Sequence, residues 1–156
     1  MLIALAEDGQ PAEHGCPYLS VVTPGWKPAE NVGPVFRRRG EVGGNAVGEV
    51  IAQLDTGRPA LVLMTLSSAF DFATSTGGIV EQQAGEPSNP HRRHAVVAAG
   101  HGLLAGKRVV LMRNSWGADW GDRGYAWLTE AYLAPRVFRI GRLTEDPDVS
   151  TCRTAA

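Results

Sequence analysis

The apolar residues of this chain fall into short runs of strand length, which are separated by turns rich in glycine and proline. The runs lie at 59–66, 94–100, 107–112, 125–128 and 137–140. Apolar runs of this length, bounded by turn residues, are typical of β-strands. The runs at 94–100 and 107–112 flank a glycine-containing segment, so we predict that they form a β-hairpin.

One segment has helical periodicity. In residues 45–54, Val47, Val50, Ile51 and Leu54 recur at helical spacing, and Asn45 stands where an N-cap is expected. Residues 1–7 have the pattern of a short helix that ends before a glycine. We therefore predict an α+β fold, with one main helix and an antiparallel, partly barrel-like sheet.

The two ends of the chain show less regular patterning. Residues 19–44 hold three prolines and five glycines, which predicts a long surface connection that crosses between two halves of a fold. Residues 146–156 have no periodicity, which predicts a disordered tail. We expect 1–44 to form the crossing segment and 45–145 the β-rich domain, with a polar loop at 81–93 leading to the strand that begins at His94.

Composition limits the function classes. With 156 residues and 44% hydrophobic content, the chain can bury the core of one domain. The net charge is −1 and the only basic block is the arginine triplet at 37–39, so we expect no nucleic-acid partner. Residues 1–6 are apolar, but Glu7 and Asp8 follow at once and no basic residue precedes them, so we expect neither a signal sequence nor a membrane span there. Its two cysteines, Cys16 and Cys152, are compatible with a disulfide or with free thiols, and the compartment stays open.

Candidate chemistry lies where the hairpin ends. Residues 113–125 contain three glycines and two tryptophans, which predicts a sharply turned loop pinned by aromatic side chains. If the hairpin folds about Leu104, His94 and Asn114 lie equally far from the turn, so their side chains can be neighbours. An amide oxygen that accepts from one ring nitrogen fixes the tautomer and leaves the other nitrogen as a base. The alternative is a half-buried histidine bonded to a turn asparagine with a structural role alone.

The sequence Asn-Ser-Trp-Gly-x-x-Trp-Gly-x-x-Gly-Tyr, after a strand that begins His-Ala-Val, resembles the C-terminal half of the papain-like cysteine peptidases. The resemblance covers about residues 4–141 and is strongest at 94–125. It implies hydrolysis of peptide bonds by a Cys-His-Asn mechanism. By this resemblance the general base is His94, the residue that orients it is Asn114, the indole that shields their hydrogen bond is Trp116, and the residue on the leaving-group side is Trp120.

The same resemblance implies a pocket for an apolar side chain two residues before the scissile bond, bordered by Cys16, Pro17, Ala60 and Ala95. It also places the nucleophilic cysteine and the oxyanion glutamine before Met1. Cys16 is a poor substitute, because Pro17 offers no backbone N–H to stabilise a thiolate. We therefore expect a chain that carries only the His and Asn half of the site, as a truncated or separately encoded piece, and that is inactive alone.

A second hypothesis makes the chain a non-catalytic module that binds peptides or proteins. In both cases we expect a peptide or protein ligand, association with a separately encoded N-terminal half or self-association through an exposed apolar seam, and no cofactor.

Other candidates for chemistry are weaker. Ser115 lacks the elbow sequence of serine hydrolases. His91, His94 and His101 lack a carboxylate or cysteine partner spaced to complete a zinc site. Arg93 stands where the resembling family carries a small or acidic residue, and a cation there opposes protonation of His94.

Overall fold

The computed structural model describes residues 2–12, 25, 33 and 35–145. It divides into two units, Met1–Glu41 with Leu143–Ala156, and Val42–Arg142. In the first unit, helix α1 (Leu2–Glu7) precedes a two-stranded antiparallel sheet of β1 (Gln10–Pro11) and β2 (Val35–Phe36). The side chain of Arg37 donates to the Glu7 carbonyl at 3.1 Å. The segment predicted as a surface connection thus contains short strands.

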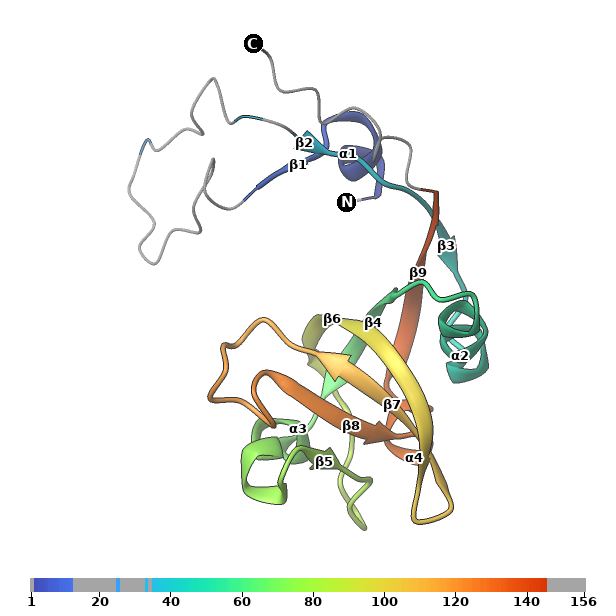
Figure 1. Ribbon diagram of the computed structural model, residues 1–156. Coiled ribbons are helices and arrows are strands. Elements are labelled where there is room, and N and C mark those ends of the chain that lie inside the picture. The colour runs from blue at the N-terminus through green and yellow to red at the C-terminus, as the bar shows by residue number, and fades with distance from the viewer. Residues whose placement is uncertain (1, 13–24, 26–32, 34, 146–156) are drawn as a thin grey trace. The chain divides into compact units, whose positions relative to one another are not determined.

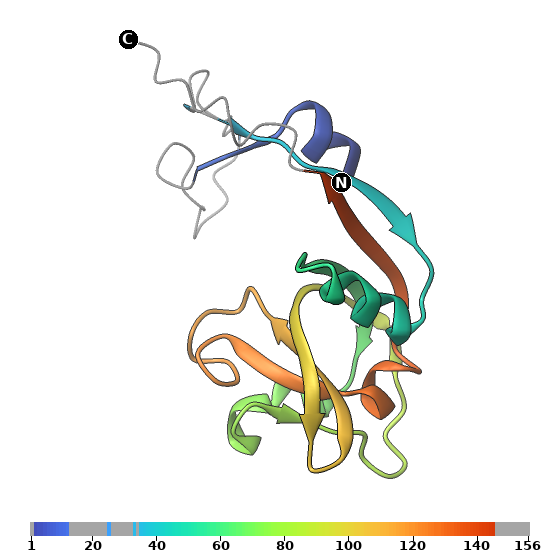
Figure 2. The ribbon, with the colours of Figure 1, turned by 45° about the vertical axis from the view of Figure 1, so that its right-hand side comes forward.

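A seven-stranded sheet has the strand order β3-β9-β4-β6-β7-β8-β5, and β4 to β8 lie entirely in the second unit. Figures 1 and 2 show β6 as a long curved strand, which lies between β4 and β7 in this order. The pairs β4–β6, β4–β9, β6–β7 and β7–β8 are antiparallel, whereas β5 and β8 are parallel. The strands are β3 (Arg39–Gly43), β4 (Ala60–Leu66), β5 (Ile79–Val80), β6 (Asn89–Leu104), β7 (Lys107–Arg113), β8 (Tyr125–Thr129) and β9 (Val137–Glu145).

Short helices connect these strands. They are α2 (Val47–Asp55), α3 (Ser68–Asp71), the 3₁₀ helix η1 (Ala73–Thr76) and α4 (Glu130–Leu133). The predicted main helix is α2, but its predicted cap is wrong, because the N-cap is Ala46 and no side chain caps it. Glu49 in the first turn instead accepts a hydrogen bond from the Gly44 backbone N–H at 3.1 Å. None of the described helices is long and apolar enough to cross a membrane.

Strand β4 shows how the sheet separates a buried face from an accessible one. Successive side chains of a strand point to opposite faces. The even-numbered side chains of β4 are buried, and those at 61, 63 and 65 are partly exposed. The buried face contributes to a core that includes Val50, Val62, Met64, Phe70, Val96, Val110, Met112, Leu128 and Ile140.

Strand β6 begins earlier than the sequence predicts. Residues 89–93 were expected to belong to a loop, but they are the first part of β6, where Asn89 pairs with Leu66 and Arg93 with Thr65 of β4. This part of the strand lacks an apolar pattern, and most of its side chains are exposed. His94 therefore lies within a strand, which constrains its backbone on both sides.

Candidate active site

The loop between β7 and β8 has the sharp turns that its glycines predict. Gly117, Gly121 and Gly124 have positive φ angles of 91°, 63° and 86°. At Gly121 a Cβ atom would lie 2.2 Å from the Tyr125 carbonyl oxygen, so only glycine fits. The loop closes on itself, since the Asn114 N–H donates to the Gly124 carbonyl at 2.9 Å. Its geometry fixes the position of the residue that follows β7.

His94 and Asn114 form the central pair of the site. The distance between His94 Nε2 and Asn114 Oδ1 is 2.7 Å. The same oxygen accepts the backbone N–H of Ser115 at 2.8 Å, which supports its assignment as the amide oxygen. Because Oδ1 accepts, Nε2 carries the proton and Nδ1 is left with its lone pair. Among the described residues Nδ1 has no hydrogen-bond partner.

A β-bulge in β6 brings the pair to one face. Leu104 pairs with Lys107 and Val97 pairs with Arg113, so β6 uses one residue more than β7 between these two pairs. The shift lies between Ala98 and Gly100. Continuing the register by one residue places Asn114 opposite Val96, diagonal to His94 on the same face. The predicted symmetric pairing of His94 with Asn114 about Leu104 is wrong in register, although the side chains do meet.

Aromatic rings surround the His94 imidazole. The Trp116 ring centre lies 5.0 Å from that of His94, with 39° between the planes. Phe70 of α3 meets His94 edge-on at 5.9 Å and Trp116 edge-on at 5.4 Å. Trp120 lies 4.6 Å from Phe70, and its indole N–H donates to the Phe70 carbonyl at 3.0 Å. Phe70 and Trp116 thus contact the imidazole directly, and Trp120 supports both of these rings from behind.

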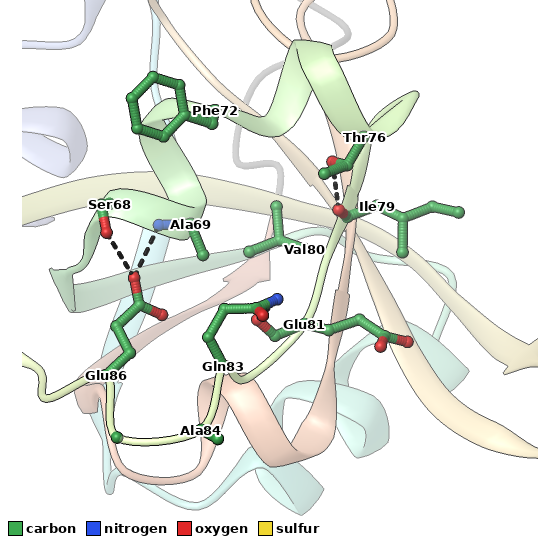
Figure 3. A pocket seen from close by; sticks show the side chains of 11 residues that line it. Ser68, Ala69, Phe72, Thr76, Ile79, Val80, Glu81, Gln83, Ala84 and Glu86 are labelled. Atoms are coloured by element: carbon green, nitrogen blue, oxygen red, sulfur yellow. Dashed lines mark hydrogen bonds between the residues drawn. The ribbon is translucent and has the colours of Figure 1, made fainter.

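Helix α3, which carries Phe70, is anchored by Glu86 (Figure 3). The carboxylate oxygen Oε1 accepts the Ser68 hydroxyl and the Ala69 backbone N–H, both at 2.8 Å. Burial alone raises the pKa of Glu86, but hydrogen bonds from Ala69 and Ser68 outweigh it and the pKa is lowered. The other oxygen lies 3.7 Å from the guanidinium of Arg136. A hollow of about 360 Å³ lies beside this anchor, lined in part by Phe72.

An ion pair flanks the site on the strand that carries His94. Arg92 donates two hydrogen bonds of 2.8 Å to the two carboxylate oxygens of Asp71. The bond to Asp71 raises the pKa of Arg92. Arg92 lies two residues before His94, on the same face of β6. Asp71 follows Phe70 on α3, so the pair ties α3 to β6 next to the imidazole.

Comparison with known proteins identifies the family of this arrangement. Residues 7–134 match the Papain family cysteine protease profile, which is most of the chain. The chain belongs to the papain family. It is 40% identical over 65 residues to Papaya proteinase 4 of Carica papaya, and 40% identical over 68 residues to a Cathepsin L-like proteinase of Fasciola hepatica. These matches cover 42% and 44% of the chain but only 18% and 20% of the two relatives.

Solved structures confirm the papain-like α+β fold. This papain-family chain superposes on the Xylella fastidiosa cysteine protease xylellain with a TM-score of 0.68 and 18% identity, covering 92% of the chain and 59% of xylellain. It superposes on the Carica candamarcensis protease CMS1MS2 with a TM-score of 0.64 and 19% identity, covering 93% and 66%. The chain thus corresponds to about two thirds or less of these proteins.

The structure gathers four of the predicted residues of this papain-family chain. His94, Asn114 and Trp116 are in contact, and Trp120 packs behind them. Trp116 is 43% exposed, whereas Trp120 is 6% exposed and leaves little surface for a ligand. Their catalytic and supporting roles stay predictions. Phe70, which contacts His94 directly, was not predicted as a site residue. Its position after an apolar strand was the only sequence signal.

The predicted pocket residues are not brought together. Ala60 has no exposed surface and pairs with the buried Ala98, whereas Ala95 is exposed and pairs with Leu63. Ala60 and Ala95 therefore lie on opposite faces of the sheet. Leu63 is the residue that shares a face with Ala95, as the alternation along β4 could have shown.

The remaining pocket residues, Cys16 and Pro17, lie outside the described residues, as does Cys152. Arg93 lies on the other face of β6 from His94, and its guanidinium is directed to the ring of Phe138. Within the described part of the chain no group of three or more His, Cys, Asp or Glu side chains could hold a metal ion.

Proposed function

We propose that this chain supplies the general base and its orienting amide to a papain-type cysteine peptidase. The observation that carries the proposal is the 2.7 Å contact between His94 Nε2 and Asn114 Oδ1, which leaves Nδ1 as the acceptor. Membership of the papain family supports peptide-bond hydrolysis as the reaction. The thiol comes from a segment outside the described residues, either of the same polypeptide or of a second one.

His94 acts twice in this reaction. Nδ1 first takes the proton of the thiol, and the imidazolium–thiolate pair is stabilised because Asn114 accepts from Nε2–H. The thiolate sulfur then bonds to the carbonyl carbon of the peptide. The C–N bond breaks, and His94 returns the proton to the leaving amine. A water molecule, deprotonated by the same nitrogen, hydrolyses the thioester and regenerates the thiol.

The neighbouring aromatic rings support these steps. Trp116 and Phe70 cover the imidazole beside its bond to Asn114. Excluding water from a hydrogen bond strengthens it, because the local dielectric constant is lower. The ring therefore keeps one orientation while its proton is exchanged on the opposite nitrogen.

The test is a hybrid enzyme. The chain is joined to the cysteine-bearing helical half of a papain-family relative such as xylellain, and hydrolysis of a fluorogenic dipeptide amide is measured under reducing conditions. We expect thiol-dependent turnover, loss of turnover in His94→Ala, and a smaller decrease in Asn114→Ala. Phe138→Leu, a change of a partly exposed ring on β9 away from the imidazole, serves as the matched control.

Two outcomes argue against the proposal. One is a folded hybrid whose thiol reacts with an epoxide inhibitor but which turns over no substrate. The other is turnover that survives His94→Ala. The first result favours the binding module over the peptidase, and the second shows that the hybrid does not use His94 as its base.

A further inference from the structure

Helix α3 is too short to fix its own position. It contains four residues, which is about one turn, and helices of this length are marginal in water without tertiary contacts. Its residue Phe70 nevertheless contacts the His94 imidazole edge-on, with 5.9 Å between the ring centres. The orientation in which Phe70 meets the imidazole therefore depends on the contacts that hold the two ends of α3.

The start and the end of α3 are held in different ways. At the start, Glu86 accepts hydrogen bonds from Ser68 and Ala69. At the end, Asp71 accepts two hydrogen bonds of 2.8 Å from the guanidinium of Arg92 on β6. The side chains of Arg92 and Asp71 are 40% and 33% exposed. The contact at the end joins α3 directly to the strand that carries the imidazole.

This ion pair lies close to both rings. Asp71 directly follows Phe70 in the chain, and Arg92 lies two residues before His94 on the same face of β6, which is about 6.6 Å along a strand. The planar guanidinium engages both carboxylate oxygens, so the pair constrains orientation as well as distance. The backbone of α3 is thus fixed one residue from Phe70 and one side-chain repeat from the imidazole.

We infer that Arg92 and Asp71 are positioning residues, which hold Phe70 against the imidazole and so keep His94 aligned with Asn114. The inference rests on the proposed function for the use of this alignment in a reaction, but not for the alignment itself. The pair has no net charge, so it acts through the position of α3. Either substitution that breaks the pair should therefore have the same effect, although Asp71→Asn leaves a cation and Arg92→Gln leaves an anion.

The alignment is measured in the isolated chain by proton NMR at about pH 8, where an ordinary histidine is neutral. One readout is the ring-current shift of the carbon-bound His94 ring protons, which depends on the positions of the neighbouring aromatic rings. The other is the rate at which the Nε2 proton exchanges with water. We expect both single variants to change the ring shifts in the same direction. Each should speed the exchange by about threefold, as is typical for the loss of a partly exposed ion pair.

A double-mutant cycle and a matched ion pair assign the effect. The double variant Asp71→Asn/Arg92→Gln should change the exchange rate no more than either single variant, because all three remove the same contact. The control is Arg108→Gln, which breaks the ion pair with Glu130. That pair also joins a strand to a short helix, β7 to α4, and its loss should leave both readouts unchanged. Urea titration of every variant separates a loss of alignment from unfolding.

The hybrid enzyme gives a second test of the same pair. A displaced base lowers the rate of the chemical step without weakening substrate binding, so Asp71→Asn and Arg92→Gln should each lower kcat by about threefold and leave KM unchanged. Arg108→Gln should change neither constant.

The inference is overturned if the single variants match the wild type in both NMR readouts, if the two variants have opposite effects, or if their effects add in the double variant. Opposite effects would show that the charges, and not the position of α3, act on the imidazole. The NMR measurement needs no turnover, so an inactive hybrid enzyme removes the proposed function without deciding this inference. An active hybrid whose kcat is unchanged in both single variants removes the inference and leaves the proposed function standing.

Discussion

Substitution of Arg136 is the strongest test of which interactions stabilise helix α3 and the segments around it. Its side chain is completely buried and donates to the Gln82 side chain and, at 2.9 Å, to the Tyr132 carbonyl. Its guanidinium carbon lies 4.0 Å from the Tyr132 ring centre. A guanidinium nitrogen of Arg136 lies 3.7 Å from Glu86 Oε2, an oxygen that is buried without a hydrogen-bond partner. Arg136 is thus the countercharge of the residue that anchors α3.

The substitution Arg136→Met keeps an apolar stem and removes the guanidinium. Removing one partner of a buried ion pair costs about 3–5 kcal/mol, because the other charge stays buried and uncompensated. Glu86 keeps its two hydrogen bonds from α3, so we expect a loss of about 3 kcal/mol in the free energy of unfolding. Urea titration followed by tryptophan fluorescence measures this loss.

The double variant Glu86→Gln/Arg136→Met is the control. It removes the lone carboxylate, so it should be more stable than Arg136→Met by at least about 1 kcal/mol. A loss below about 1 kcal/mol in Arg136→Met, or a double variant no more stable than the single one, would refute the reasoning. Either result would mean that the cation and the carboxylate are not coupled.

The pKa of Glu86 gives this pair a pH dependence. Since the pKa in the folded protein is below the ordinary value of 4.5, the ionised carboxylate stabilises the fold above pH 4.5. That contribution is lost as the pH falls through the folded pKa. The stability difference between the wild type and Glu86→Gln should therefore shrink below pH 4.5, and a difference that stays constant from neutral to acidic pH would contradict the assignment.

Three further predictions concern the loop and the isolated chain. Trp120→Phe leaves the Phe70 carbonyl without its donor and should cost about 2 kcal/mol in unfolding free energy, seen by urea titration. Gly121→Ala drives a Cβ against the Tyr125 carbonyl at positive φ and should cost about 3 kcal/mol by the same assay. Gly117→Ala, with no atom within 4 Å of its Cβ, should cost only about 1 kcal/mol, and equal losses would contradict the steric argument. The isolated chain should neither hydrolyse a dipeptide amide nor be labelled by an epoxide inhibitor, and mass spectrometry that found a labelled cysteine together with turnover would show a nucleophile within the chain.

The sequence predicted the strands and the central pair for a physical reason. Apolar runs and turn glycines are local signals, so the hairpin that joins β6 and β7 and the loop after Asn114 could be recognised. The proximity of His94 and Asn114 follows from that hairpin. Their register could not be predicted, because the bulge between Ala98 and Gly100 has no distinct local pattern in an Ala-Ala-Gly sequence.

Contacts between distant segments were also beyond local patterns. Glu86 and Arg136 lie 50 residues apart, Glu86 in the segment before β6 and Arg136 in the segment before β9, so their pairing depends on the tertiary fold. Phe70 reaches His94 only because α3 folds back beside β6. The wrong assignment of Ala60 to the pocket had a different cause. The alternation along β4 is present in the sequence, and it assigns Leu63, not Ala60, to the accessible face.

The extra residue in β6 confines the tolerance of the site to changes in chain length to a single position. Ala98 pairs with Met112 and Gly100 with Leu111, so Ala99 has no partner across the hairpin, and its side chain is exposed. Deleting Ala99 would make the pairing regular and leave Asn114 diagonal to His94 on the same face. Deleting a residue between Ala95 and Ala98 would instead turn the side chain of His94 to the opposite face, so that the hydrogen bond could no longer form although neither site residue had changed. Among related sequences, gaps should therefore occur at Ala99 and be rare between His94 and Ala98.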